Sequence, residues 1–386
     1  MGAPRGARAG EVFACFLRLG LTAFGGPAMV AYIREQVVAR RRWVAEADFE
    51  AGVALCQTLP GATAMQAAAY AGLRAAGPRG ALAAYAGFGL PALLLMVALA
   101  AAYERAHALP AVAAAFTGLK AVVCAIVGRA TVTFGRKVVR DPRDLALAAA
   151  AALFLAAGGP PAVAIGVAAL LSLLRFRDLG AAAAPAAAPV AGAGRAALGL
   201  ALGLALLLAA LAALRPQLFR LAALMVRVDL LAFGGGYASL PLLLHQVVAV
   251  RGWLDAPTFM DGIALGQVTP GPIVITATFV GQLVAGLGGA LAATAGMFTP
   301  SLVVLLAAVP HLDRLGASPG VRRALRGVLA TFVGLLAAVL LRFLQATPWS
   351  PVTAAVAAAA FAALLAGIDL LWVVAAGAAA AAWLGP

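Results

Sequence analysis

Residues 57–61 read Gln-Thr-Leu-Pro-Gly, and residues 267–271 read Gln-Val-Thr-Pro-Gly. A Phe-Gly-Gly precedes each of them, at residues 24–26 and at residues 233–235. The copies are offset by 209 residues at the first motif (24 to 233) and by 210 at the second (60 to 270). A duplicated apolar unit whose copies are both broken by Gly and Pro is typical of transporters built from structural repeats, which bind substrate at the helix breaks.

The composition indicates a polytopic membrane protein. The chain has 386 residues, of which 64% are hydrophobic and 11% charged, and its mean hydropathy is +1.02. A soluble domain contains about 25% charged residues. The net charge of +14 comes from Lys and Arg clustered in short loops, where they hold loops on the cytoplasmic side rather than bind nucleic acid. The three cysteines lie far apart and predict neither disulfides nor a metal site.

The apolar stretches divide the chain into two similar halves. Each half ends in a pair of short stretches, 145–157 with 161–174 and 351–366 with 368–384, which we interpret as tight hairpins of short or tilted helices. The fold class predicted is an all-α polytopic membrane protein with two inverted-topology repeats and broken helices. We expect an N-terminal repeat over 1–175, a linker over 176–195, a connecting transmembrane helix over 196–214 and a C-terminal repeat over 215–386.

The loop charges predict that the two repeats face opposite ways. In the first copy the first, second and fourth loops are basic, and the third carries only Arg105. In the second copy the third loop is the basic one, with Arg314, Arg322, Arg323 and Arg326. The positive-inside rule then puts matching loops on opposite faces and the N-terminus in the cytoplasm. Because the first and second loops of copy one both favour the cytoplasm, the segment 50–73 between them is expected to be broken or re-entrant.

Two arginines occupy matching places inside apolar segments. Arg18 lies six residues before Phe24, and Arg227 lies six residues before Phe233. A charge at membrane depth is costly and usually functional, and the planar guanidinium suits a tetrahedral oxyanion. The alternative is a structural role, in which each arginine snorkels to the interface or pairs with a carboxylate such as Asp229.

The helix breaks themselves are the other candidate site. An interrupted helix exposes backbone N–H groups and the positive end of a half-helix dipole, and both attract anions. Gly and Pro could instead serve only close helix packing. Gln57 and Gln267 precede the breaks and could bond substrate or cap freed backbone groups. The candidate substrate-binding residues are Arg18, Phe24, Gly25, Gly26, Gln57, Pro60, Gly61, Arg227, Phe233, Gly234, Gly235, Gln267, Pro270 and Gly271.

Groups that would support other chemistry are scarce. The titratable residues near the breaks are Glu50, Asp229 and Asp261, and we interpret the three histidines as loop residues. No nucleotide-binding Gly-x-x-x-x-Gly-Lys-Ser/Thr motif is present in the sequence, which disfavours ATP-driven transport by this chain alone. We expect no cofactor, no metal and no enzymatic activity. A membrane-embedded enzyme would need a catalytic base or metal cluster at membrane depth.

Three stretches of the chain resemble the chromate ion transporter family. They are residues 16–27, the Arg40-Arg41-Arg42-Trp43 that follows, and residues 57–62. The second copy, with Phe233-Gly234-Gly235-Gly236-Tyr237 and residues 267–272, resembles the C-terminal half of the family's long-chain members. The resemblance implies a multi-pass protein of the inner (plasma) membrane with two homologous halves in opposite orientation. It also implies export of chromate, with sulfate as a related or competing oxyanion.

We therefore expect a secondary transporter that exports chromate, with sulfate as a related oxyanion, by alternating access of two inverted repeats. The alternative is a passive oxyanion channel, because matched helix breaks would serve either protein. A steep dependence of flux on a proton or ion gradient would favour the transporter. The partners expected are the oxyanion and the lipid bilayer, and a homodimer is also compatible with the sequence.

Overall fold

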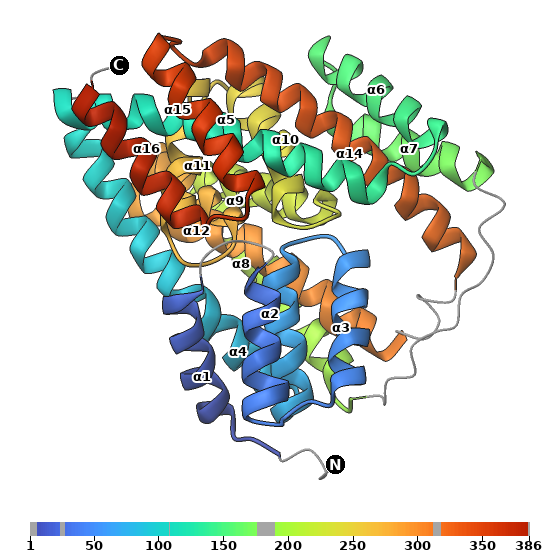
Figure 1. The fold of residues 1–386 in the computed structure, drawn as a ribbon. Coiled ribbons are helices and arrows are strands. Elements are labelled where there is room, and N and C mark those ends of the chain that lie inside the picture. The colour runs from blue at the N-terminus through green and yellow to red at the C-terminus, as the bar shows by residue number, and fades with distance from the viewer. Residues whose placement is uncertain (1–5, 24–27, 108, 176–189, 312–317, 385–386) are drawn as a thin grey trace.

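A computed structural model describes residues 6–23, 28–107, 109–175, 190–311 and 318–384 of the chain. Within these ranges every regular element is a helix, and the one extended pairing is an isolated β-bridge between Pro60 and Phe233. Five of the described helical segments are long and apolar enough to cross a membrane. The prediction of an all-α polytopic membrane protein is confirmed (Figure 1).

The helices of the first half follow the predicted apolar stretches. They are α1 (Ala9–Thr22), α2 (Ala28–Arg34), the π-helix Glu35–Arg40, α3 (Glu46–Thr58), α4 (Thr63–Ala106), α5 (Pro110–Val138), α6 (Pro142–Ala156) and α7 (Pro161–Arg175). The predicted short pair is α6 with α7. α6 begins after Asp141, whose side chain accepts hydrogen bonds from the N–H groups of the first helical turn.

The second half repeats this order after one additional helix, α8 (Ala193–Leu214). Its elements are α9 (Pro216–Leu231), a 3₁₀ turn (Gly236–Ala238), α10 (Ser239–Leu244), the π-helix His245–Val250, α11 (Ala256–Val268), a 3₁₀ turn (Ile273–Ile275), α12 (Thr276–Ala308), a 3₁₀ turn (Val309–His311), α14 (Pro319–Ala346), α15 (Pro351–Leu365) and α16 (Leu370–Leu384). The short pair expected at the end of this half is α15 with α16.

Matching positions of the two halves adopt matching backbone conformations. α4 bends sharply at Gly77 (φ +65°), and α12 bends at Gly286 (φ +61°). The turns after the π-helices contain Arg42 (φ +54°) and Gly252 (φ +57°). Because backbone conformation at these points agrees copy by copy, the sequence repeat is also a repeat of local structure.

The segment after α3 folds back as a helical hairpin. Gly52 of α3 packs against the ring of Tyr70 in α4, and Asp48 forms an ion pair with Arg74. In each pair the two residues lie equally far from Gly61 along the chain. α3 and the first part of α4 therefore run antiparallel, with Pro60-Gly61 at the tip. A break within the segment 50–73 was expected from two consecutive basic loops. Gly262 packs against Phe279 in the corresponding place of the second half.

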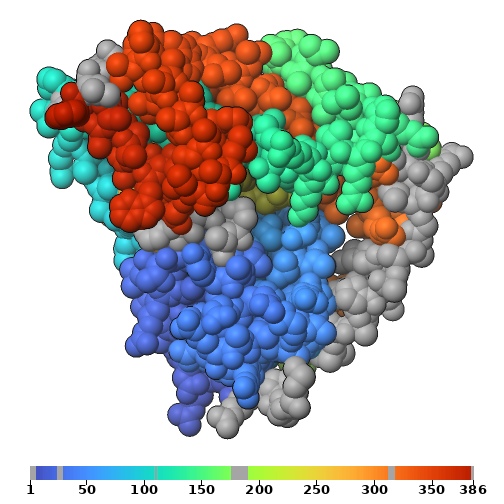
Figure 2. Space-filling model, viewed as in Figure 1, coloured from blue at the N-terminus to red at the C-terminus, as the bar shows by residue number. Residues whose placement is uncertain are grey.

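Helices of each half pack against helices of the other half. α1 packs on α4 as α9 packs on α12, whereas α5 packs against α15 and α16, and α14 packs against α6 and α7. Figure 2 shows the blue helices α1 to α3 on the lower part of one face, with the red helices α15 and α16 above them on the left and the green helices α6 and α7 above them on the right. The contact of α5 with α15 and α16 is thus matched by the contact of α14 with α6 and α7.

Candidate functional site

Each described helix break falls where the sequence predicts it. α3 ends at Thr58 and α4 begins at Thr63, and Gly61 between them has φ +110°. α11 ends at Val268, and Gly271 after it has φ +126°. Gly234 and Gly235, which follow α9, have φ +95° and +100°. A side chain is strained at such φ values, so glycine is the residue that permits each break. Phe24, Gly25 and Gly26 lie outside the described residues.

The breaks of one half bond to the breaks of the other. The Gly61 N–H donates to the Ala232 carbonyl oxygen over 2.9 Å, and the Gly271 N–H donates to the Ala23 carbonyl oxygen over 3.2 Å. The bridge between Pro60 and Phe233 extends the first contact. Each hairpin tip thus meets the end of the first helix of the opposite copy. The described breaks of the two copies therefore lie together.

Both tips pack tightly against a long helix. A Cβ on Gly61 would overlap the Cβ of Ser301 in α12, and a Cβ on Gly271 would lie 2.7 Å from the Cβ of Ala92 in α4. Ser301 and Ala92 each follow a proline that lies inside its helix, Pro300 and Pro91. The four central residues Pro60, Gly61, Pro270 and Gly271 are buried, so this conformation holds the breaks closed.

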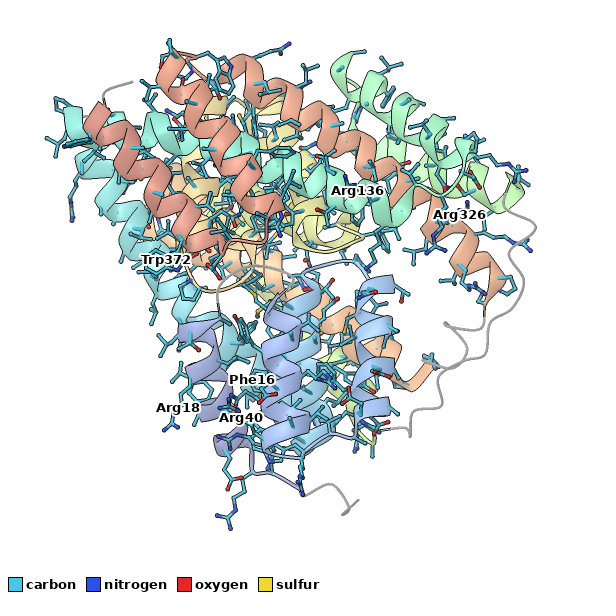
Figure 3. The ribbon with its side chains drawn as sticks, in the orientation of Figure 1. Phe16, Arg18, Arg40, Arg136, Arg326 and Trp372 are labelled. Atoms are coloured by element: carbon cyan, nitrogen blue, oxygen red, sulfur yellow. The ribbon has the colours of Figure 1, made fainter. Side chains whose placement is uncertain are left out.

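The prediction that the two matched arginines face the interior is wrong in this structure. Arg18 is exposed on α1, and Arg227 is exposed on α9; Figure 3 shows Arg18 at the outer edge of α1. The reason is helix rotation. The buried face of α1, which includes Phe16 and Leu19, packs against α4. Arg18 lies two residues after Phe16 and therefore on the opposite side of the helix from it, pointing away from α4. Their role in substrate binding stays an untested prediction.

The two glutamines of the motifs do not have matching environments. Gln57 is exposed near the end of α3, whereas Gln267 is buried in α11 and its Nε2 has no hydrogen-bond partner. Phe233 is half-buried where it pairs with Pro60. A buried amide with an unused donor is the side chain of this set best suited to bond an oxyanion that enters between the breaks.

A buried polar cluster beside the Pro60-Gly61 tip was only partly anticipated. The Ser301 N–H donates to Asp229 Oδ2 over 2.7 Å. The Tyr85 hydroxyl donates to the Phe298 carbonyl oxygen over 2.7 Å and lies 3.1 Å from Ser301 Oγ. The Gln66 Nε2 donates to the Pro60 carbonyl oxygen over 2.7 Å. Sequence reasoning identified Asp229 because it is a titratable group near a break, but it missed Ser301, Tyr85 and Gln66, which lie far from Asp229 in the sequence and belong to no recognisable motif.

A second buried carboxylate lies where α4, α5 and α11 meet. The Tyr103 hydroxyl donates to Asp261 Oδ2 over 2.9 Å, and Lys120 Nζ lies 3.5 Å from Asp261 Oδ1. That separation gives an ion pair without a hydrogen bond, and Oδ1 has no hydrogen-bond partner. Asp261 therefore has a counter-ion, which distinguishes it from Asp229.

The histidines differ from the prediction that all three lie in loops. His245 is buried at the start of the π-helix after α10, and its Nδ1 has no hydrogen-bond partner. His107 follows the last turn of α4, where its ring stacks on Tyr103. In the described part of the chain no group of three or more His, Cys, Asp or Glu residues could hold a metal ion.

A groove of about 330 Å³ lies between α5, α14 and α15, away from the breaks. Its walls are apolar and include Cys124, Leu340, Trp349 and Phe361. An oxyanion would lose its hydration there without gaining hydrogen bonds, so the helix breaks remain the better candidate site.

Comparison with known proteins identifies the family. The family model described as chromate transporter matches residues 10–173 and again residues 219–383. The chain belongs to the chromate transporter family. The two matched regions coincide with the two sequence copies, from α1 to α7 and from α9 to α16. Membership agrees with a multi-pass protein of the plasma membrane that is a transporter and not an enzyme.

Curated relatives cover most of the chain. An uncharacterized transporter of Methanocaldococcus jannaschii is 39% identical over 343 residues, which are 88% of this chain and 85% of the relative. A chromate transport protein of Pseudomonas aeruginosa is 33% identical over 339 residues, 87% and 81% of the two chains. A chromate transport protein of Cupriavidus metallidurans is 31% identical over 342 residues, 83% and 79%. No solved structure matches the chain.

Proposed function

We propose that this protein is a secondary transporter that carries chromate out of the cell across the plasma membrane. The family and the names of two relatives support chromate as the substrate. The observation that carries the mechanism is the reciprocal pair of hydrogen bonds between breaks, from Gly61 to Ala232 and from Gly271 to Ala23. Sulfate has the same tetrahedral shape and charge, so it is expected to compete for the site.

The two reciprocal bonds give the anion its donors. In the closed conformation the tip N–H groups of Gly61 and Gly271 are occupied by carbonyl oxygens of the opposite copy. When one tip separates from its partner, its N–H is freed just before the N-terminus of the helical segment that follows it, α4 in the first copy and the 3₁₀ turn leading into α12 in the second, where the backbone dipoles attract an anion. Opening one tip at a time would expose the site to one side of the membrane and then to the other.

The proposed domains follow from this scheme. The repeats over 1–175 and 215–386 are inverted relative to each other, and α8, within the predicted connecting helix, carries the chain across the membrane between them. Its 22 residues and apolar composition suit a crossing. Reporter fusions at residues 34–42 and at residues 241–257 would report opposite faces. Fusions that report the same face would refute the inversion.

Export is favoured by electrostatics. Bacterial membranes are negative inside, and each negative charge that moves outward gains about 2.3 kcal/mol per 100 mV. The direct test is uptake of labelled chromate into everted vesicles under imposed pH gradients and membrane potentials, with sulfate as competitor. A transporter is expected to saturate and to depend on the gradient of a coupled ion. Flux that follows the chromate gradient alone, without saturation, would instead support the passive channel.

A further inference from the structure

Asp229 is a carboxylate in an unusual place. It lies two residues before the end of α9, fully buried, and its Oδ2 accepts the Ser301 N–H over 2.7 Å. Its Oδ1 has no hydrogen-bond partner. That oxygen points at the tip of the first hairpin, because a Cβ built on Gly61 would lie 3.2 Å from it. An unpaired oxygen is thus aimed at the contact between two helix breaks.

The surroundings of Asp229 supply no counter-charge among the described residues. The hydrogen bonds of the cluster bring in one titratable side chain, Tyr85 of α4, through Ser301. The arginines of α9 that come nearest in sequence, Arg220 and Arg227, are exposed. Gln66 Oε1, in the same cluster, also has no hydrogen-bond partner, so the cluster contains two buried acceptor oxygens without a donor. An ionised carboxylate in this setting would be costly to bury.

The space beside Asp229 Oδ1 decides whether a metal ion or a proton can neutralise the buried carboxylate. Gly61 and Ser301 are so close that even a Cβ on Gly61 would overlap the serine side chain. A metal ion with its oxygen ligands therefore has no room at this contact, whereas a proton needs none. The first copy has Gly20 at the position of Asp229, packed against the backbone of Phe88. The chain therefore has one such carboxyl group and not a matched pair.

We propose that Asp229 is a proton-binding site, and that its proton is bound and released together with the oxyanion. The inference rests on the proposed function, since it places the anion at the breaks. In the closed contact a proton taken from water sits on Oδ1. When the tip opens, a dianion at the freed N–H groups keeps the neighbouring carboxyl protonated, because a second negative charge there would repel it. Without the anion, Asp229 meets water and its proton returns to water. One proton thus accompanies each dianion.

The proton itself can be tested without any anion. Infrared spectra of the purified protein in nanodiscs are expected to contain the carbonyl band of a protonated carboxyl group, and this band should be absent from Asp229→Asn. Asparagine keeps the acceptor for the Ser301 N–H and resembles the neutral acid, so this variant is expected to fold. Asp261→Asn is the matched control, a buried carboxylate with a counter-ion at a different place, and it should retain the band. A band that persists unchanged in Asp229→Asn overturns the proposal.

Coupling to the anion is tested by proton uptake in weakly buffered solution, with sulfate or chromate added and a pH indicator present. At a pH high enough that the infrared band is absent before the anion is added, the parent and Asp261→Asn should take up about one proton for each anion bound, because proton binding and anion binding are linked reciprocally. Asp229→Asn should take up none while it still binds the anion. Equal uptake in Asp229→Asn, or anion binding that follows sodium concentration and not pH, overturns the proposal. If neither anion binds to the parent, the proposed function fails, and the infrared result still decides whether Asp229 holds a proton.

Discussion

Replacement of Gly61 by alanine should disable transport, because this residue is constrained twice. Its φ of +110° lies where L side chains are strained, at a cost of about 1–3 kcal/mol. Its added Cβ would also overlap Ser301, and overpacking of that kind costs about 1–3 kcal/mol. The sum, about 2–6 kcal/mol, would weaken the closed contact at least about tenfold, since 1.4 kcal/mol changes an equilibrium tenfold.

The assay is the initial rate of labelled chromate uptake into everted vesicles, normalised to the amount of protein in the membrane. Gly77→Ala is the matched control for strain alone, because Gly77 has φ +65° but open space around the added Cβ. It should cost about 1–3 kcal/mol and leave transport largely intact. Gly61→Ala should lose most of its activity while the protein still inserts.

A second variant separates the steric contact from general damage. Ser301→Gly removes the opposing Cβ but keeps the backbone N–H that bonds Asp229. The double variant Gly61→Ala/Ser301→Gly should therefore recover part of the lost transport, as expected of residues in contact. If Gly61→Ala transports chromate like the parent, the tip contact is not part of the transport cycle. If the double variant is no better than the single one, the overlap with Ser301 is not the cause.

Three further predictions follow from the charged residues. Arg18→Gln and Arg227→Gln should change chromate uptake less than Gly61→Ala does, because both side chains are exposed; loss of uptake in both variants would restore their predicted role in binding. Arg326→Gln should lower the thermal stability of the detergent-solubilised protein by about 3 kcal/mol, because it leaves the fully buried Asp144 without its two-pronged partner; an unchanged melting temperature would contradict this. Partial burial alone would raise the pKa of Asp141, but the backbone N–H groups at the start of α6 and the guanidinium of Arg326 hold that pKa below its ordinary value. Its contribution to stability is therefore present at neutral pH and lost as the pH falls through the lowered pKa, so melting curves of Asp141→Asn should show a weaker loss of stability in acid than those of the parent.

The sequence by itself determined the class of protein and the positions of its breaks. A composition that is 64% hydrophobic excludes a soluble fold, and the phrase repeated at residues 57–61 and 267–271 marks two equivalent interruptions. These are local properties, because proline removes a helix hydrogen bond and glycine permits positive φ wherever they occur. Two basic loops in succession indicated a break within residues 50–73, where the structure has a hairpin with Pro60-Gly61 at its tip.

Only the tertiary structure decided which groups these breaks bring together. Whether Arg18 faces the interior depends on the rotation of α1 against α4, which a matched position in two copies does not fix. The bond from Gly61 to Ala232 joins residues of opposite copies, so it arises from the way the halves interlock. The same packing buries Asp229 against Ser301 and leaves one of its oxygens unpaired. Such contacts join residues distant in sequence, and their free energy depends on the mutual placement of whole helices.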